Sequence, residues 1–123
     1  MIERLKKRRD FLAAAQGSKA ARRAFVLEAR LRGDEGPARF GFTVTKRTAK
    51  KAVERNRIRR RLRETVRLHA AELHPGYDFV LIGRRKALSE PFSDLKATLA
   101  EALRQAAASP NSGRASELRS AGR

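Results

Sequence analysis

Cysteine is absent from this sequence of 123 residues, and aromatic side chains make up only 6% of it. Without cysteine the chain forms no disulfides and offers no thiolate metal ligands. No apolar run approaches the roughly 18–20 residues that cross a bilayer, and the charged first ten residues do not resemble a secretory signal. We therefore expect a single domain in the cytoplasm, with neither a membrane nor a small-molecule substrate as its partner.

Acidic residues are also scarce. Thirty Lys and Arg stand against 13 Asp and Glu, which gives a formal net charge of +17 and a sequence pI near 11.7. A compact state with this charge repels itself unless a polyanion relieves the repulsion. Nucleic acid is the usual polyanion for such a composition, and an anionic membrane is the competing one.

Hydrophobic periodicity predicts helices and strands in the order α-β-β-α-β-α. The pattern favours an α+β fold in which one mostly antiparallel sheet is packed with helices in two layers. The first helix is expected to place Ile2, Leu5 and Leu12 on one face, and Ser93 is expected to cap the last helix. Residues 1–108 are expected to form the domain, and 109–123 a disordered basic tail. The expected elements are helix 2–15, strands 25–31 and 39–46 paired as a hairpin, helix 53–73, strand 77–83 and helix 93–107.

The helix beginning near residue 53 carries the strongest functional signal. Ten residues between Lys46 and Arg63 are basic, and the apolar stripe of Ile58, Leu62 and Val66 leaves the opposite face almost purely cationic. Like charges four residues apart and cations at a helix N-terminus both disfavour the helix. Because phosphates would reverse both effects, the pattern favours binding of a polyanion over a merely solvated charged face.

The string Arg55-Asn-Arg-Ile-Arg-Arg-Arg-Leu-Arg-Glu64 resembles the RNR signature of the bacterial ribonuclease P protein component. The flanking pieces resemble the family in the right order: residues 5–11 its opening helix, 41–47 and 76–82 its strands on either side of the basic helix. The resemblance implies a two-layer α+β fold with a further short strand and a left-handed β-α-β crossover. It also implies binding to a catalytic RNA that removes the 5′ leader of precursor tRNA.

The resemblance assigns residues to two binding surfaces. The family's positions that face the catalytic RNA match Arg55, Asn56, Arg57, Arg59, Arg60 and Arg63. Its cleft for the single-stranded leader, between the first helix and the sheet, is assigned Phe11, Val26, Thr45, Lys46, Arg47, Arg85 and Lys86. This sequence departs from the family at Ala15, where a second aromatic is frequent, and at Glu28, where Tyr is frequent.

No residue pattern supports catalysis by the protein itself. His69 lies on the apolar stripe, His74 is read as a helix cap, and the scattered carboxylates have no metal-ligand spacing. The resemblance to the ribonuclease P protein implies that the RNA holds Mg²⁺, and that this ion activates the attacking water. Two alternatives remain at this point: a ribosomal-type structural RNA-binding protein with no role in cleavage, and a protein-only nuclease with its own acid and base.

Overall fold

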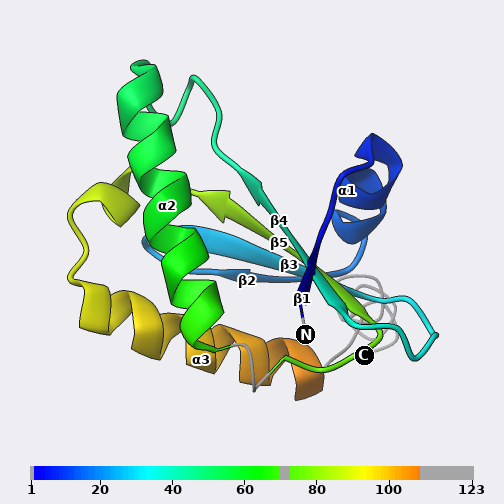
Figure 1. Ribbon diagram of the computed structural model, residues 1–123. Coiled ribbons are helices and arrows are strands. Elements are labelled where there is room, and N and C mark those ends of the chain that lie inside the picture. Colours follow the sequence, from blue (N-terminus) through cyan, green and yellow to red (C-terminus); the bar gives the residue numbers. More distant parts are fainter. Residues whose placement is uncertain (1, 70–72, 109–123) are drawn as a thin grey trace, which may run out of the picture.

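One five-stranded sheet runs through the part of the chain that the computed structural model describes, residues 2–69 and 73–108 (Figure 1). The strand order across the sheet is β1-β4-β5-β3-β2. The strands are β1 (Ile2–Arg4), β2 (Ser18–Ala21), β3 (Phe25–Leu31), β4 (Ala38–Thr43) and β5 (Tyr77–Gly83). The helices are α1 (Arg8–Ala14), α2 (Ala52–Leu68), the 3-10 helix η2 (Arg85–Leu88) and α3 (Phe92–Ala108). The expected tail, 109–123, lies outside the described residues.

The α+β class is confirmed, but the predicted hairpin of β3 and β4 is wrong. β5 lies between them and pairs antiparallel with β3 and parallel with β4. Six of the seven residues of β5 are buried, and a strand buried on both faces is best placed at the centre of a sheet. Since β1 and β4 are parallel as well, two of the four pairings are parallel, and the sheet is mixed rather than mostly antiparallel.

Parallel pairing of β4 and β5 requires a crossover, which α2 provides. In Figure 1 both strands point to the left, β5 lies below β4, and α2 passes in front of the sheet. The β4-α2-β5 crossover is therefore left-handed, as the resemblance implied and against the usual right-handed rule.

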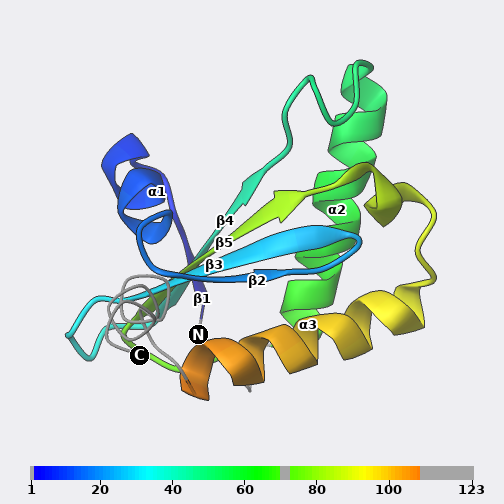
Figure 2. The same cartoon turned by 180° about the vertical axis from the view of Figure 1, so that it is seen from behind.

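The main core lies between the sheet and the layer of α2 and α3 (Figures 1 and 2). The predicted stripe of α2 is confirmed, because Ile58, Leu62 and Val66 are all buried. Their partners are alternate residues of the central strands and one face of α3, which are Phe25, Leu27, Phe79, Leu81, Leu95, Leu99 and Leu103. His69 is also buried, and its Nε2 lies 2.9 Å from the carbonyl oxygen of Lys96, which supports a structural role.

The short helix α1 packs on the opposite face of the sheet, so the expectation of two layers is incomplete. Leu5, Ala14 and Val80 form a second, smaller core there, with Phe11 packed against it. The predicted helix over 2–15 is wrong in its first half, because residues 2–4 pair with β4 and the Leu5 amide donates to the Phe40 carbonyl at 2.8 Å. Leu12, predicted to share one helix face with Ile2 and Leu5, is 55% exposed, whereas Leu5 is buried. Sheet pairing outweighs helix propensity in this segment.

Several other boundaries differ from the expectations. β2 was not predicted, because its residues, Ser-Lys-Ala-Ala, carry no apolar alternation. α2 ends at Leu68 with His69 as its C-cap residue, so the predicted cap of this helix by His74 is wrong. α3 begins at Phe92, directly after Pro91, which places Ser93 inside the first turn rather than at the cap. Proline is favoured at such a helix start because its missing N–H is not needed there.

Candidate nucleic-acid interface

The outward face of α2 presents guanidinium groups that the protein does not neutralise. Asn56, Arg57, Arg60 and Arg63 are exposed, and Arg55 and Arg59 are partly so. None of these five arginines forms an ion pair with an acid among the described residues. The predicted cationic face is therefore present, and its charge is available to a partner.

Two of these arginines also fasten the loop before the helix. Arg55 donates to the carbonyl oxygens of Ala49 and Lys50, both at 2.8 Å. Arg59 donates to the Val44 carbonyl at 3.4 Å and to Asn56 Oδ1 at 3.1 Å. These contacts hold the loop of residues 44–51 against the first half of α2. The exposed basic residues of this loop are Lys46, Arg47, Lys50 and Lys51.

The N-terminus of α2 adds to the positive potential of this loop. Lys51 is the N-cap residue, and its side chain makes no capping hydrogen bond. The helix start thus combines free backbone donors with a cluster of cations, an arrangement that attracts phosphate. Asp, Ser or Thr, the usual stabilising caps, would accept a hydrogen bond from a backbone N–H group of the first turn and so compete with a phosphate.

Arg85, assigned to the leader cleft, is paired with α2. Its guanidinium is 3.2 Å from the Glu54 carboxylate in the first turn of that helix. This hydrogen bond lowers the pKa of Glu54 below its ordinary value. Lys86 is exposed in the same short helix, η2, which packs against α2. Arg61 of α2 is bonded to the carbonyl oxygens of Ala87 and Glu90 and so holds η2 in place.

The α1 face of the sheet brings together part of the predicted leader cleft. Phe11, partly buried, lies directly over Gly41, and Ile82 packs in the same small core. Ile82 pairs with Val26 on one side and with Thr43 on the other, which gives a row across three strands. Thr45, Lys46 and Arg47 are exposed just beyond the end of that row, and Thr45 is hydrogen-bonded to Thr48.

The two departures from the family pattern also lie on or beside this face. Glu28 is buried and accepts a hydrogen bond from Lys19 at 2.6 Å, across the β2–β3 pairing. The position that is often aromatic in the family therefore holds a satisfied ion pair. Ala15, at the C-cap of α1, is partly buried. Phe11 is the aromatic that remains here for stacking.

Gly41 is the residue that lets Phe11 approach the sheet. A Cβ atom at this position would lie 2.5 Å from two ring atoms of Phe11 and 3.2 Å from Leu5 Cβ. We expect Gly41→Ala to displace the ring and to weaken binding of leader-containing precursor tRNA to the holoenzyme about ten-fold, the scale of one lost stacking contact. Affinity for mature tRNA, measured in parallel, should stay unchanged. Equal losses for both RNAs would contradict the cleft assignment.

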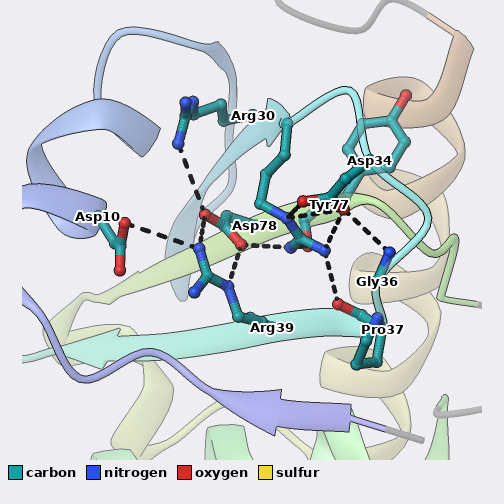
Figure 3. A network of polar contacts seen from close by, with 9 residues as sticks. Asp10, Arg30, Asp34, Gly36, Pro37, Arg39, Tyr77 and Asp78 are labelled. Carbon is teal, nitrogen blue, oxygen red and sulfur yellow. Dashed lines mark hydrogen bonds and ion pairs between the residues drawn. The ribbon is translucent and has the colours of Figure 1, made fainter.

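A buried carboxylate, Asp78, anchors α1 at the other end of the same face (Figure 3). Asp78 is fully buried and receives hydrogen bonds from Arg32 at 2.6 Å and from Arg39 at 2.7 Å. Arg30 lies 3.8 Å away, and Arg39 also reaches Asp10 of α1 at 3.6 Å. The three arginines come from strands or loops distant from β5 in sequence, so sequence patterning did not reveal this cluster.

Charge balance decides the ionisation of Asp78. Burial by itself would raise the pKa of Asp78, but the hydrogen bonds from Arg39 and Arg32 outweigh it and lower that pKa below its ordinary value. The carboxylate therefore stays charged and is the buried partner that Arg32 and Arg39 share, in addition to Asp34 and Asp10. Because Asp10 precedes Phe11, the cluster also helps to position the ring over Gly41.

The described residues hold no group of three or more His, Cys, Asp or Glu arranged to bind a metal ion. Within the same ranges, no helix is long and apolar enough to span a membrane. The expected cytoplasmic location stays a prediction.

Fold and surface together define a small basic α+β protein with one cationic helix face and a partly buried aromatic ring on the opposite face of the sheet, which suits an RNA-binding subunit. The ribonuclease P family model matches residues 2–107. The ribonuclease P protein component of Gluconacetobacter diazotrophicus is 49% identical over 105 residues, covering 84% of this chain and 90% of the relative. The ribonuclease P protein component of Brucella suis is 44% identical over 103 residues, covering 76% of this chain and 72% of the relative.

Solved structures of ribonuclease P proteins have the same fold as this chain. The ribonuclease P protein of Thermotoga maritima superposes with a TM-score of 0.71 at 30% identity, covering 84% of this chain and 96% of that one. The ribonuclease P protein of Staphylococcus aureus superposes with a TM-score of 0.70 at 29% identity, covering 84% of this chain and 94% of that one. The chain belongs to the ribonuclease P protein family. It is accordingly the protein subunit of the ribonucleoprotein endoribonuclease that removes the 5′ leader from precursor tRNA.

Proposed function

We propose that the two faces of the protein bind two different RNAs. The outward face of α2 binds the catalytic RNA through Arg55, Asn56, Arg57, Arg59, Arg60 and Arg63. The α1 face of the sheet receives the single-stranded leader of precursor tRNA on Phe11 and Val26, with Thr45, Lys46 and Arg47 at its edge. The observation that carries the proposal is that Arg55, Arg57, Arg59, Arg60 and Arg63 of α2 have no acidic partner in the part of the chain that the structure describes.

The physical reason for this division lies in the shape of each face. A convex helix surface rich in arginine suits bidentate contacts with the phosphates of a folded RNA. A partly buried aromatic ring beside exposed cations suits an extended strand, whose bases are free to stack. Arg85 and Lys86 lie on the α2 side, so we assign them to the border of the catalytic RNA surface rather than to the leader.

Catalysis in this proposal belongs to the RNA. Mg²⁺ held by RNA phosphates would activate water and stabilise the leaving oxygen. The protein's cations lower the repulsion between catalytic RNA and precursor tRNA, and its cleft positions the leader. No side chain of the protein acts as acid, base or nucleophile in this scheme.

Reconstitution tests the proposal directly. Purified protein, catalytic RNA and precursor tRNA are combined at low Mg²⁺, and 5′ leader release is measured with and without each component. We expect no cleavage by the protein alone and faster cleavage when the protein joins the catalytic RNA. Cleavage by the protein alone would indicate a protein nuclease. The absence of any effect on the RNA enzyme would favour a purely structural RNA-binding protein.

A further inference from the structure

A hollow lies on the α2 face of the sheet, on the side opposite Phe11. It has a volume of about 250 Å³ and is bounded by β1, β4 and the C-terminal half of α2. Of its lining residues only Arg63 belongs to the cationic face of α2, and none belongs to the residues assigned to the leader. Its lining residues are Glu3, Arg4, Phe40, Phe42, Arg63, Val66 and Arg67.

The floor of this hollow is aromatic and rigid. Phe42 is partly buried and stacks on Phe40, with ring centroids 5.9 Å apart. Phe40 stacks in turn on Phe79 at 5.0 Å, and Phe79 on Tyr77 at 5.4 Å. Phe42, the outermost of these stacked rings, is therefore held in one orientation by Phe40 beneath it. This reduces the entropy lost when a planar group stacks on Phe42.

The rim of the hollow is cationic. Arg4 and Arg63 form no ion pair among the described residues, whereas Arg67 is paired with Glu64. Glu3 is the one carboxylate in the lining. The Arg63 guanidinium carbon lies 6.0 Å from the centre of the Phe42 ring. A planar, apolar surface with free positive charge on two sides favours an occupant that is flat and carries negative charge beside its ring.

We infer that this hollow binds one unstacked nucleobase of RNA, placed between the Phe42 ring and the Arg63 guanidinium. A ring inserted between two planes needs about 7 Å between them at van der Waals contact. The Arg63 side chain is exposed and has to move outward from the Phe42 ring to open that space. The Glu3 carboxylate accepts a hydrogen bond from an exocyclic amino group, and Arg4 binds an adjoining phosphate.

A bulge, loop or single strand is required, because a base inside a duplex is not accessible for stacking. The surroundings favour such an RNA over an apolar peptide. A neighbouring hollow of about 590 Å³ shares Glu3 and Arg4 and is lined further by Lys6, Lys7, Arg9, Asp10 and Arg39, so that basic residues outnumber acidic ones in it. A nucleotide chain leaving the base site along β1 would therefore meet further cations for its phosphates.

The inference rests on the proposed function, since Arg63 is also part of the face assigned to the catalytic RNA. It adds Arg4 and Phe42, from strands that the RNR string does not include. It also predicts a stacking contribution that salt does not screen, in contrast to the phosphate contacts of α2.

The test compares Phe42→Leu and Arg4→Ala with Arg104→Ala, an exposed arginine on α3 that removes the same charge as Arg4→Ala. Affinity for the catalytic RNA is measured from 50 to 200 mM salt, and the fold is checked by thermal unfolding. We expect Phe42→Leu to weaken binding about ten-fold at every salt concentration, since only stacking is lost. Arg4→Ala should weaken binding and lower the salt slope by about one unit. Arg104→Ala should bind as the parent.

Ultraviolet cross-linking of the parent complex, followed by mass spectrometry, should yield a nucleotide attached within 38–43. If Phe42→Leu and Arg4→Ala both bind as the parent while α2 variants lose affinity, the base site is wrong and the proposed function stands. If the α2 variants also bind normally, the proposed function fails. If the parent is a dimer that Phe42→Leu dissociates, the hollow is a contact between protein copies, and the inference is overturned.

Discussion

Replacing Arg57 and Arg60 together with alanine should lower affinity for the catalytic RNA about 100-fold and leave the fold intact. Both side chains are exposed, and neither has an acidic partner among the described residues. One hydrogen bond to a charged group is worth about 1.5–3 kcal/mol, so two lost phosphate contacts give a loss of at least this size. The slope of log affinity against log salt should fall by about two, because two fewer counterions are released.

A double variant on α3, Lys96→Ala with Arg104→Ala, is the matched control because it removes the same charge from another surface. Its affinity should change far less than that of the α2 variant. Similar losses in both would mean that net charge alone drives binding. Circular dichroism should show the same helix content in all proteins. Unfolding of the α2 variant would contradict the assignment of these residues to the outward face.

Replacing Asp78 with asparagine should destabilise the protein by about 3–5 kcal/mol, the cost of removing one member of a buried ion-pair cluster. Asp78 is fully buried, and Arg32 and Arg39 depend on it. The midpoint of thermal unfolding should fall by at least about 10 °C. Asp34→Asn, which removes an exposed partner of Arg32, should cost less than about 1 kcal/mol. Equal effects would show that the buried cluster contributes no more than a surface pair.

The pH dependence of stability provides a second readout of the same cluster. The pKa of Asp78 is lower in the folded protein than its ordinary value, so the unfolded chain binds a proton at higher pH than the folded one. The stabilisation is therefore complete above the ordinary pKa of aspartate, about 3.9, and is lost as pH falls through the lower, folded-state pKa. Denaturant titrations between pH 5 and 2 should show a smaller acid-induced loss in Asp78→Asn than in the parent.

The cluster also connects stability with the leader cleft. Arg39 bridges Asp78 and Asp10, and Asp10 adjoins Phe11 in α1. Any Asp78→Asn protein that remains folded should therefore bind the leader more weakly while its α2 surface is unchanged. This coupling is mechanical, because α1 has only a small core of its own.

The sequence by itself determined the features that one segment can express alone. The stripe of Ile58, Leu62 and Val66 defined the buried side of α2 and hence its cationic side, because helical periodicity is a local property. The apolar run of residues 77–83 indicated a strand buried on both faces. The excess of basic residues indicated a polyanion as partner.

Only the tertiary structure decided which segments meet. Residues 2–4 form a strand because the edge of β4 offers backbone partners, which a helix-forming composition does not reveal. β5 separates β3 from β4 because a strand buried on both faces gains most at the centre of the sheet. The Asp78 cluster and the Phe42 hollow each join residues more than twenty positions apart in sequence. Such contacts depend on burial and charge balance summed over the whole fold, whereas periodicity reports only the surroundings of one segment.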